Sequence, residues 1–376
     1  MGLEGFIDQA TIDTLNQRLI EIRLVHFERT TKGSLLLDLI RVFQLKLATR
    51  NRDHLFALLT LANNADDPIF DPDYQEPFEN IVRRYTTGFL RQGECYGLLK
   101  LVGLSEHSRP DRFPSWIPDW TRQPRSMAVG RFVFEKLKCA AAGTTKPVAC
   151  FDSASDVLII NGRSCGSINV MVSAMKSPDD KASQQQYLAQ CEVEVRSVQH
   201  SPGSQELSEV LWRTLIANDD KMPLSKASAA YTMAFSYRRR LAESLEQPAA
   251  FDAVGSGQRA TVAEEETDNN ISGHTRFDPP RFDSSRFCYK SRFMDLTSHY
   301  SFAITDTGYA CLVPNTSIAG DIICVFYGCK VPFVIRKSTI RHDNIYQLIG
   351  QCYVHGIMNG EVLADEQLVD EEIRLH

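Results

Sequence analysis

The sequence predicts an α+β protein: an N-terminal helical bundle packed on a mostly antiparallel sheet or half-barrel, with a further helical segment and a long loop inserted. Apolar residues recur at helical spacing between residues 11 and 103. Short β-branched runs bounded by Gly begin near residue 129, and closely spaced runs of the same kind return at 300–356. We therefore expect the helices to cover the sheet and the whole chain to form one compact unit.

The predicted organisation has two parts, a bundle at 1–105 and an α+β region at 106–376. Within the second part we expect strands at about 129–172, helices at about 181–246, a loop at 247–285 and C-terminal strands at 300–356. The loop loses all periodicity and is rich in Pro, Gly, Ser and Asp, which is typical of a long loop or a disordered insertion. Its string GSGQRA fits the dinucleotide fingerprint by letter only, because no α/β unit surrounds it.

Four helices are predicted in the bundle. The first begins at Thr11, the second at Ser34, the third spans 54–62, and the fourth follows the Asp-Pro-Asp break at 71–73. The apolar stripes that define three of them are Ile12, Leu15, Leu19 and Ile22; Leu36, Ile40, Phe43 and Leu47; and Phe78, Val82, Tyr85 and Phe89. Such stripes predict packed helices, with one face of each turned towards a shared core.

The strand predictions rest on turn residues as much as on β-branched runs. The runs 156–162 and 167–172 are predicted to form a hairpin, which places Ser164 of GRSCG in its turn. A nucleophile elbow is disfavoured there because that motif needs a helix after the serine. The segment 301–313 is predicted as two strands around the turn 306–308. Further on, 211–218 reads as a helix and Arg238–Arg240 as a solvated helix face.

Composition excludes several classes of function. The chain has 376 residues and a net charge of -6, and it lacks the basic stripe of a nucleic-acid binder. No signal peptide is recognisable, and no window approaches the roughly 18 apolar residues of a membrane span. Ten scattered cysteines without a C-x-x-C pair predict core thiols in the cytoplasm. The string DDPIFD at 66–71 is broken by Pro, so a solvated loop is expected and no metal or cofactor is indicated.

The string PSWIPDW at 114–120 has two interpretations. Its prolines fix φ and exclude a helix, so Trp116 and Trp120 are expected to clamp the bundle to the sheet. Alternatively, Trp120 and Arg122 form the wall of a ligand pocket at that junction. The first interpretation is favoured.

The C-terminal strands contain the other candidate site residues. Gly320 and Asp321 are predicted to form a tight turn before a buried strand, and Arg336 to form a structural salt bridge at a strand end. Tyr353 and His355 are expected on the same side of a strand because side chains alternate with period two. They either donate hydrogen bonds to a ligand carbonyl or belong to a satisfied core, and the core is the more common outcome.

Several strings resemble the C-terminal region of fungal heterokaryon-incompatibility (HET) proteins. They are RNRDHLFALLTLA, PDYQEPFENIVRRYTTGFL, PSWIPDW, LWRTLIAN, GCKVPFVIRK and YQLIGQCYVHGIMNGE, in that order along nearly the whole chain. The blocks that carry the HET domain itself are absent from the sequence. The resemblance therefore implies the body of such a protein without its effector, and no cell-death or nucleotide-cleaving activity is carried over.

Two functions remain open, and the first of them is narrowly favoured. Standalone HET-like chains resemble the norbornene-forming Diels–Alderases of fungal terpenoid (sordaricin-type) metabolism, which implies a cofactor-free cyclase acting on a small apolar oxidised terpenoid. For that reading, the hypothetical catalytic donors are Tyr353, His355 and Arg336, and the hypothetical substrate-binding residues are Trp116, Trp120, Arg122, Tyr85, Phe89 and Tyr327. The alternative is a non-catalytic allorecognition or regulatory interaction protein. The oligomeric state is not encoded in any motif.

Overall fold

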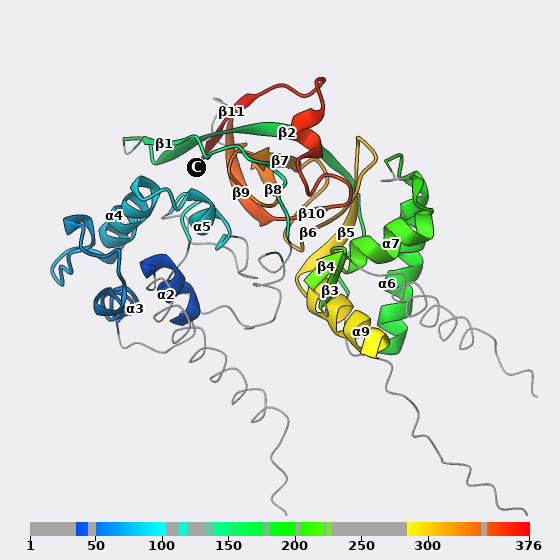
Figure 1. Ribbon diagram of the computed structural model, residues 1–376, viewed down its shortest axis with the longest axis horizontal. Helices are drawn as coiled ribbons and strands as arrows, with labels where there is room; N and C mark the ends of the chain where they lie inside the picture. Colours follow the sequence, from blue (N-terminus) through cyan, green and yellow to red (C-terminus); the bar gives the residue numbers. More distant parts are fainter. Residues whose placement is uncertain are drawn as a thin grey trace, which may run out of the picture.

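The computed structural model describes residues 35–43, 50–102, 113–118, 120, 134, 138–152, 154–175, 177, 180–200, 204–221, 224–226, 284–339 and 344–376. It confirms the predicted α+β class: helices precede and flank a mixed sheet of nine strands. Figure 1 shows the sheet rolled into a barrel, with the N-terminal helices on one side and a second group of helices on the other. The predicted helix after Thr11 lies outside the described residues.

The N-terminal bundle consists of short helices around one longer helix. Its elements are α2 (Leu36–Phe43), α3 (Asp53–Phe56), η1 (Leu59–Leu61), η2 (Pro68–Phe70), α4 (Phe78–Arg91) and α5 (Cys95–Leu99). The single helix predicted at 54–62 is wrong, because the chain changes there from α3 to a 3₁₀ turn. Hydrogen bonds from Leu58 N to Leu55 O and from Leu61 N to Leu58 O tighten it. This turn buries Leu58 and leaves Leu61 43% exposed.

Helix α4 confirms the apolar stripe read from the sequence. Tyr85 and Phe89 on this stripe are completely buried. The Tyr85 hydroxyl donates to Phe70 O at 2.5 Å, and the Phe70 ring lies 5.2 Å from the rings of both Tyr85 and Phe89. Phe70 can approach this closely because Gly88 has no side chain, as a Cβ there would lie 2.6 Å from Phe70 Cζ.

The barrel is built from strands that lie far apart in the sequence. They are β1 (Ala149–Asp152), β2 (Val157–Met171), β5 (Tyr300–Thr305), β6 (Ala310–Pro314), β7 (Ile322–Phe326), β8 (Phe333–Lys337), β9 (Ile345–Gln351), β10 (Tyr353–Val354) and β11 (Glu371–Leu375). Strands β2, β7, β8, β9 and β11 form a ring that closes when β11 pairs with β2. Strand β5 pairs with the far half of β2, and β6 and β10 continue the sheet from it. The half-barrel of the prediction is therefore a closed barrel, and β9–β11 is its parallel pair.

Strand β2 corrects the predicted hairpin at 156–172, which is one continuous strand of 15 residues. Its glycines, read from the sequence as turn residues, serve other purposes. A Cβ on Gly162 would lie 2.5 Å from Val325 O, so glycine permits close approach of β7. Gly166 has φ 122° at a register shift against β7, where it forms a β-bulge. Ser164 therefore lies within a strand and not in a turn.

The second group of helices packs beside β5 and β6 (Figure 1). It comprises α6 (Lys181–Glu194), η4 (Val195–Ser197), α7 (Leu207–Leu215) and α9 (Ser284–Thr297), together with the hairpin of β3 (Asp219–Lys221) and β4 (Leu224–Lys226). The one-turn helix α10 (Glu361–Ala364) precedes β11. Helix α9 is absent from the prediction, and its first two residues replace the end of the predicted loop. The rest of that loop, GSGQRA and Arg238–Arg240 lie outside the described residues.

Nine cysteines have described side chains; all nine are free thiols, and seven of them are buried. Burial raises the pKa of both Cys95 and Cys165 to about 12, so both stay protonated at neutral pH. No described helix is long and apolar enough to cross a membrane. The described residues also contain no group of three metal-ligating side chains, and Asp67 of DDPIFD caps η2 by accepting from Ile69 N at 2.9 Å.

The packing at Gly88 predicts that Gly88→Ala destabilises the protein, although alanine is the better helix former. Propensity alone favours Gly88→Ala by about 1 kcal/mol. Because the added methyl would overlap Phe70, we expect a net loss of about 1–3 kcal/mol in the free energy of unfolding. Urea denaturation measures it, and Asn80→Ala at an exposed position of α4 is the matched control, expected to be neutral or slightly stabilising. An increase in stability for Gly88→Ala would show that Phe70 repacks freely.

Candidate functional site

The two tryptophans of PSWIPDW contact different parts of the fold. The Trp116 ring packs edge-on against Phe151 of β1 at 5.2 Å, and its indole Nε1 donates to Asp156 O at 3.2 Å. The Trp120 ring packs edge-on against Phe89 of α4 at 5.9 Å. One tryptophan therefore holds the β1–β2 turn and the other holds the bundle, in agreement with the predicted clamp. Arg122, the other candidate in this segment, lies outside the described residues.

Asp156 ties the β1–β2 turn to the bundle. Its backbone has φ 56°, and its carboxylate accepts from Arg83 Nε and Nη2 of α4, each at 3.0 Å. The neighbouring Ser115 joins two strands of the barrel: its hydroxyl donates to His376 O and accepts from Leu348 N at 2.8 Å. These contacts make the junction between bundle and barrel a network of specific bonds in addition to apolar packing.

Tyr353 and His355 are brought together as predicted, and a third residue completes a hydrogen-bonded chain. The distance from Tyr353 Oη to His355 Nδ1 is 2.8 Å, and His355 Nε2 lies 2.8 Å from Gln205 Oε1. Because an amide oxygen only accepts, Nε2 carries the proton and Nδ1 accepts from the tyrosine hydroxyl. Both ring residues are 3% exposed. The chain therefore connects β10 to Gln205, two residues before α7.

The surroundings of Tyr353 keep its hydroxyl protonated. Burial raises its pKa well above the ordinary value, the Cys139 and Glu361 side chains add to the rise, and Arg213 opposes it. Tyr353 is thus a hydrogen-bond donor at physiological pH. In the arrangement described, its proton is directed at His355.

Arg336 forms the structural salt bridge expected of it. Its Nε and Nη2 donate to the two carboxylate oxygens of Asp321 at 2.7 and 2.8 Å, and Nη2 also donates to Thr316 O at 2.9 Å. Asp321 is 1% exposed and directly follows Gly320, whose φ of 90° forms the predicted turn. The ion pair joins the start of β7 to β8, and its bidentate form raises the pKa of Arg336 above the ordinary value.

Tyr327 lies in a separate network near the end of β7. Its hydroxyl donates to Asp370, which also accepts from Arg163 Nε of β2 at 2.7 Å. Arg163 Nη1 donates further to the carbonyl oxygens of Val362, Leu363 and Asp365 at 3.1–3.2 Å, around the end of α10. This network fastens the segment before β11 to β2.

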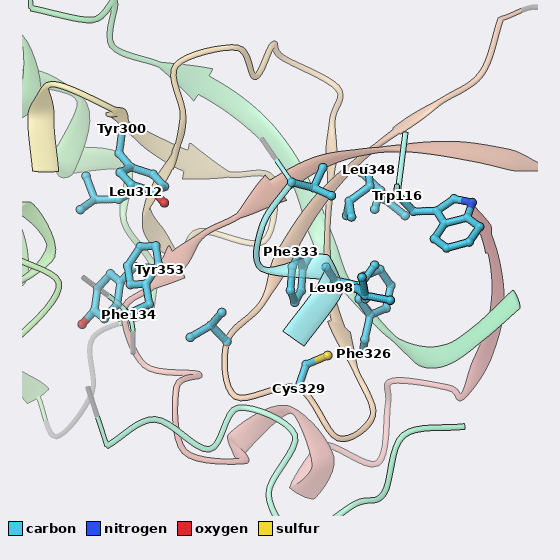
Figure 2. Packing of buried hydrophobic residues seen from close by; sticks show 14 of the residues in the cluster. Leu98, Trp116, Phe134, Tyr300, Leu312, Phe326, Cys329, Phe333, Leu348 and Tyr353 are labelled. Atoms are coloured by element: carbon cyan, nitrogen blue, oxygen red, sulfur yellow. The ribbon is translucent and has the colours of Figure 1, made fainter. Parts of the chain in front are cut away.

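The proposed site residues do not converge on one point. Figure 2 shows Tyr353 beside Tyr300, Leu312 and Phe134, away from Trp116 beside Leu348. Tyr85, Phe89 and Trp116 are fully buried and expose no surface. The sequence did not predict the hydrogen-bond partners of three other candidates. These pairs are His355 with Gln205, Trp116 with Asp156 and Tyr327 with Asp370. The two residues of each pair are 40 or more positions apart, and no local pattern marks the partner.

A few buried polar atoms have no hydrogen-bond partner. Among the described residues these include Trp120 Nε1 and Thr86 Oγ1. A buried donor without an acceptor costs about 1–3 kcal/mol, so such atoms mark places where a further group could bind. Trp120 is therefore the one aromatic candidate with an available polar atom.

The Arg336–Asp321 pair gives a double-mutant prediction. Arg336→Ala leaves the Asp321 carboxylate buried and uncompensated, so we expect a loss of about 3–5 kcal/mol in the free energy of unfolding. Removing the charge as well, in Arg336→Ala with Asp321→Asn, should recover part of that loss. Chemical denaturation of the four proteins in the cycle measures the coupling. Equal stability of the single and double variants would contradict a buried, desolvated pair.

Comparisons with known proteins connect this barrel to fungal incompatibility proteins. Residues 190–371 match the model of the Het-6 beta-barrel domain family. That range contains α7 and β5–β10, whereas β2, which the ring requires for closure, lies before it. A segment of 62 residues is 42% identical to "Heterokaryon incompatibility protein 6, OR allele" of Neurospora crassa. The match covers 16% of this chain and 9% of that protein.

No solved structure matches the chain. The domain model and the Neurospora match both point to the family that the sequence strings resemble. Together they support a heterokaryon-incompatibility-like family for this chain.

Proposed function

We propose that this chain is a non-catalytic recognition module of the heterokaryon-incompatibility type. The observation that supports it is that the candidate catalytic groups are engaged in internal bonds. Arg336 is paired with Asp321, Tyr353 donates to His355, and His355 donates to Gln205. Groups committed in this way hold a barrel rigid and present its surface, but they are not directed at a substrate.

The chemistry of the surface favours a protein partner. A net charge of -6 opposes binding to a phosphate backbone. Rigid barrels present loops and edges in fixed positions, which lowers the entropic cost of recognition. The two networks that fasten β7, β8 and β11 keep those loops in place. The module would thus act by binding another protein of an incompatibility system.

The test is genetic and uses the relative named above. We expect expression of this chain to change the fraction of growth-arrested, dye-stained cells in Neurospora crassa carrying the OR allele, and not in an otherwise identical strain lacking it. An Arg336→Ala variant, which leaves the buried Asp321 carboxylate uncompensated and is expected to fold poorly, is the control for the effect of expression alone. No change in either strain, or an equal change in both, would contradict the proposal.

The second candidate function is the cofactor-free cycloaddition. One observation favours it: the buried Trp120 Nε1, whose ring packs on Phe89, has no hydrogen-bond partner among the described residues. An intramolecular Diels–Alder reaction needs only a folded substrate and a donor to its activating carbonyl, so no metal or nucleophile is required. Trp120 would be that donor, at the junction of bundle and barrel.

The matching experiment compares product formation from an oxidised cyclopentadiene-bearing terpenoid with the spontaneous rate. If Trp120 donates to the carbonyl, Trp120→Phe keeps the aromatic ring and should lower the catalysed rate about 10-fold. Tyr85→Phe, which removes a hydroxyl engaged with Phe70 O, is the control. If the wild-type protein gives the spontaneous rate, the cyclase function is excluded for that substrate class.

A further inference from the structure

Strand β1 has an edge on which no strand of the described residues pairs. Its register with β2 is Ala149↔Ile160, and in the same register Asn161 N donates to Val148 O at 3.1 Å. Val148, Cys150 and Asp152 therefore turn their backbone N–H and C=O groups towards β2. Ala149 and Phe151 turn their N–H and C=O groups to the opposite edge, because these directions alternate in an antiparallel strand.

One face of β1 and of the residues just before it carries four exposed side chains. Lys146 and Val148 precede β1, Cys150 and Asp152 lie in it, and Val148 is 55% exposed. On the other face Phe151 packs on Trp116, and Ala149 is exposed. In chain order the four side chains of the first face are positive, apolar, apolar and negative. That order is self-complementary when two strands run antiparallel, because each end meets its opposite charge.

We propose that the β1 edge pairs with the same edge of a second copy of this chain. The two strands run antiparallel, in the register that places Lys146 opposite Asp152 of the second copy and Val148 opposite Cys150. Two ion pairs then flank two apolar pairs. A shift by two residues would set Cys150 against Cys150 and Val148 against Asp152, which removes both direct ion pairs. The charge pattern therefore selects one register and a copy of this chain as the occupant.

The backbone of Ala149 fits this register, because Ala149 faces Ala149 of the second copy and the two residues exchange a pair of N–H···O bonds. In the next hydrogen-bonded pair Phe151 N–H donates to Pro147 O of the second copy, and the return bond to Phe151 O is absent because proline has no N–H. The edge is also fixed before association, because Arg83 and Trp116 hold the β1–β2 turn through Asp156. Little ordering entropy is then lost on binding.

The primary test is sedimentation velocity over a series of protein concentrations. A strand edge this short makes a small interface, so we expect a weak dimer in the micromolar range or above. Lys146→Asp and Asp152→Lys each create two like-charged pairs and should weaken association about 10-fold or more. The double variant Lys146→Asp, Asp152→Lys restores opposite charges and should return association close to that of the wild type.

A cross-linking experiment fixes the register. Directly opposed side chains of this pair type lie about 4.5–5.5 Å apart at Cβ. Val148→Cys should therefore form disulfide-linked dimers with Cys150 of the second copy on oxidation with copper-phenanthroline, faster than wild type. The Asp152 carboxylate also accepts hydrogen bonds from Ala154 N and Ser155 Oγ, so Asp152→Lys removes bonds of the β1–β2 turn as well as the charge. Lys146→Asp changes an exposed side chain and therefore tests the charge alone. A monomer at every concentration, or association unaffected by Lys146→Asp, would overturn the proposal.

Discussion

Closure of the barrel by β2 is the constraint on which the rest of the structure depends. This one strand pairs with β1 and β7 along one edge and with β11 and β5 along the other. The change of partner occurs at Gly162 and Gly166, where any side chain would collide with β7 or with the turn at Asp306. Closed barrels leave few strand edges exposed, so the residues that permit closure also protect the protein from association through the rest of the sheet.

The sequence predicted elements whose signal is local. The stripe of Phe78, Val82, Tyr85 and Phe89 marked α4, and alternation placed Tyr353 beside His355. It failed where a residue's role is set by a distant segment. Gly162 and Gly166 have the composition of a turn, and only the approach of β7 reveals their function. The pairs Arg83–Asp156 and Gln205–His355 span 73 and 150 residues, and local patterns carry no information at that range.

Buried polar groups in this fold mainly form hydrogen bonds between different secondary-structure elements. The Asp321 carboxylate, the His355 ring and the Trp116 indole each bind a group from another part of the fold. His355 joins the barrel to the second group of helices, and the Asp156 carboxylate joins it to α4 through Arg83. Such bonds contribute modest net stability but penalise every alternative packing in which they are broken. The barrel is therefore held in one arrangement, which is what a recognition module requires and what a substrate-folding enzyme would need around its pocket.

The pairing of β11 with β2 has a consequence for biogenesis. Arg163 and Asp370 are 207 residues apart, so the ring stays open while the ribosome adds the helices and strands between them. Contacts of such long range make folding slow, and the half-built sheet exposes the edge of β2 in the meantime. The edge of β2 that pairs with β11 therefore stays without that partner until residues 371–375 are synthesised.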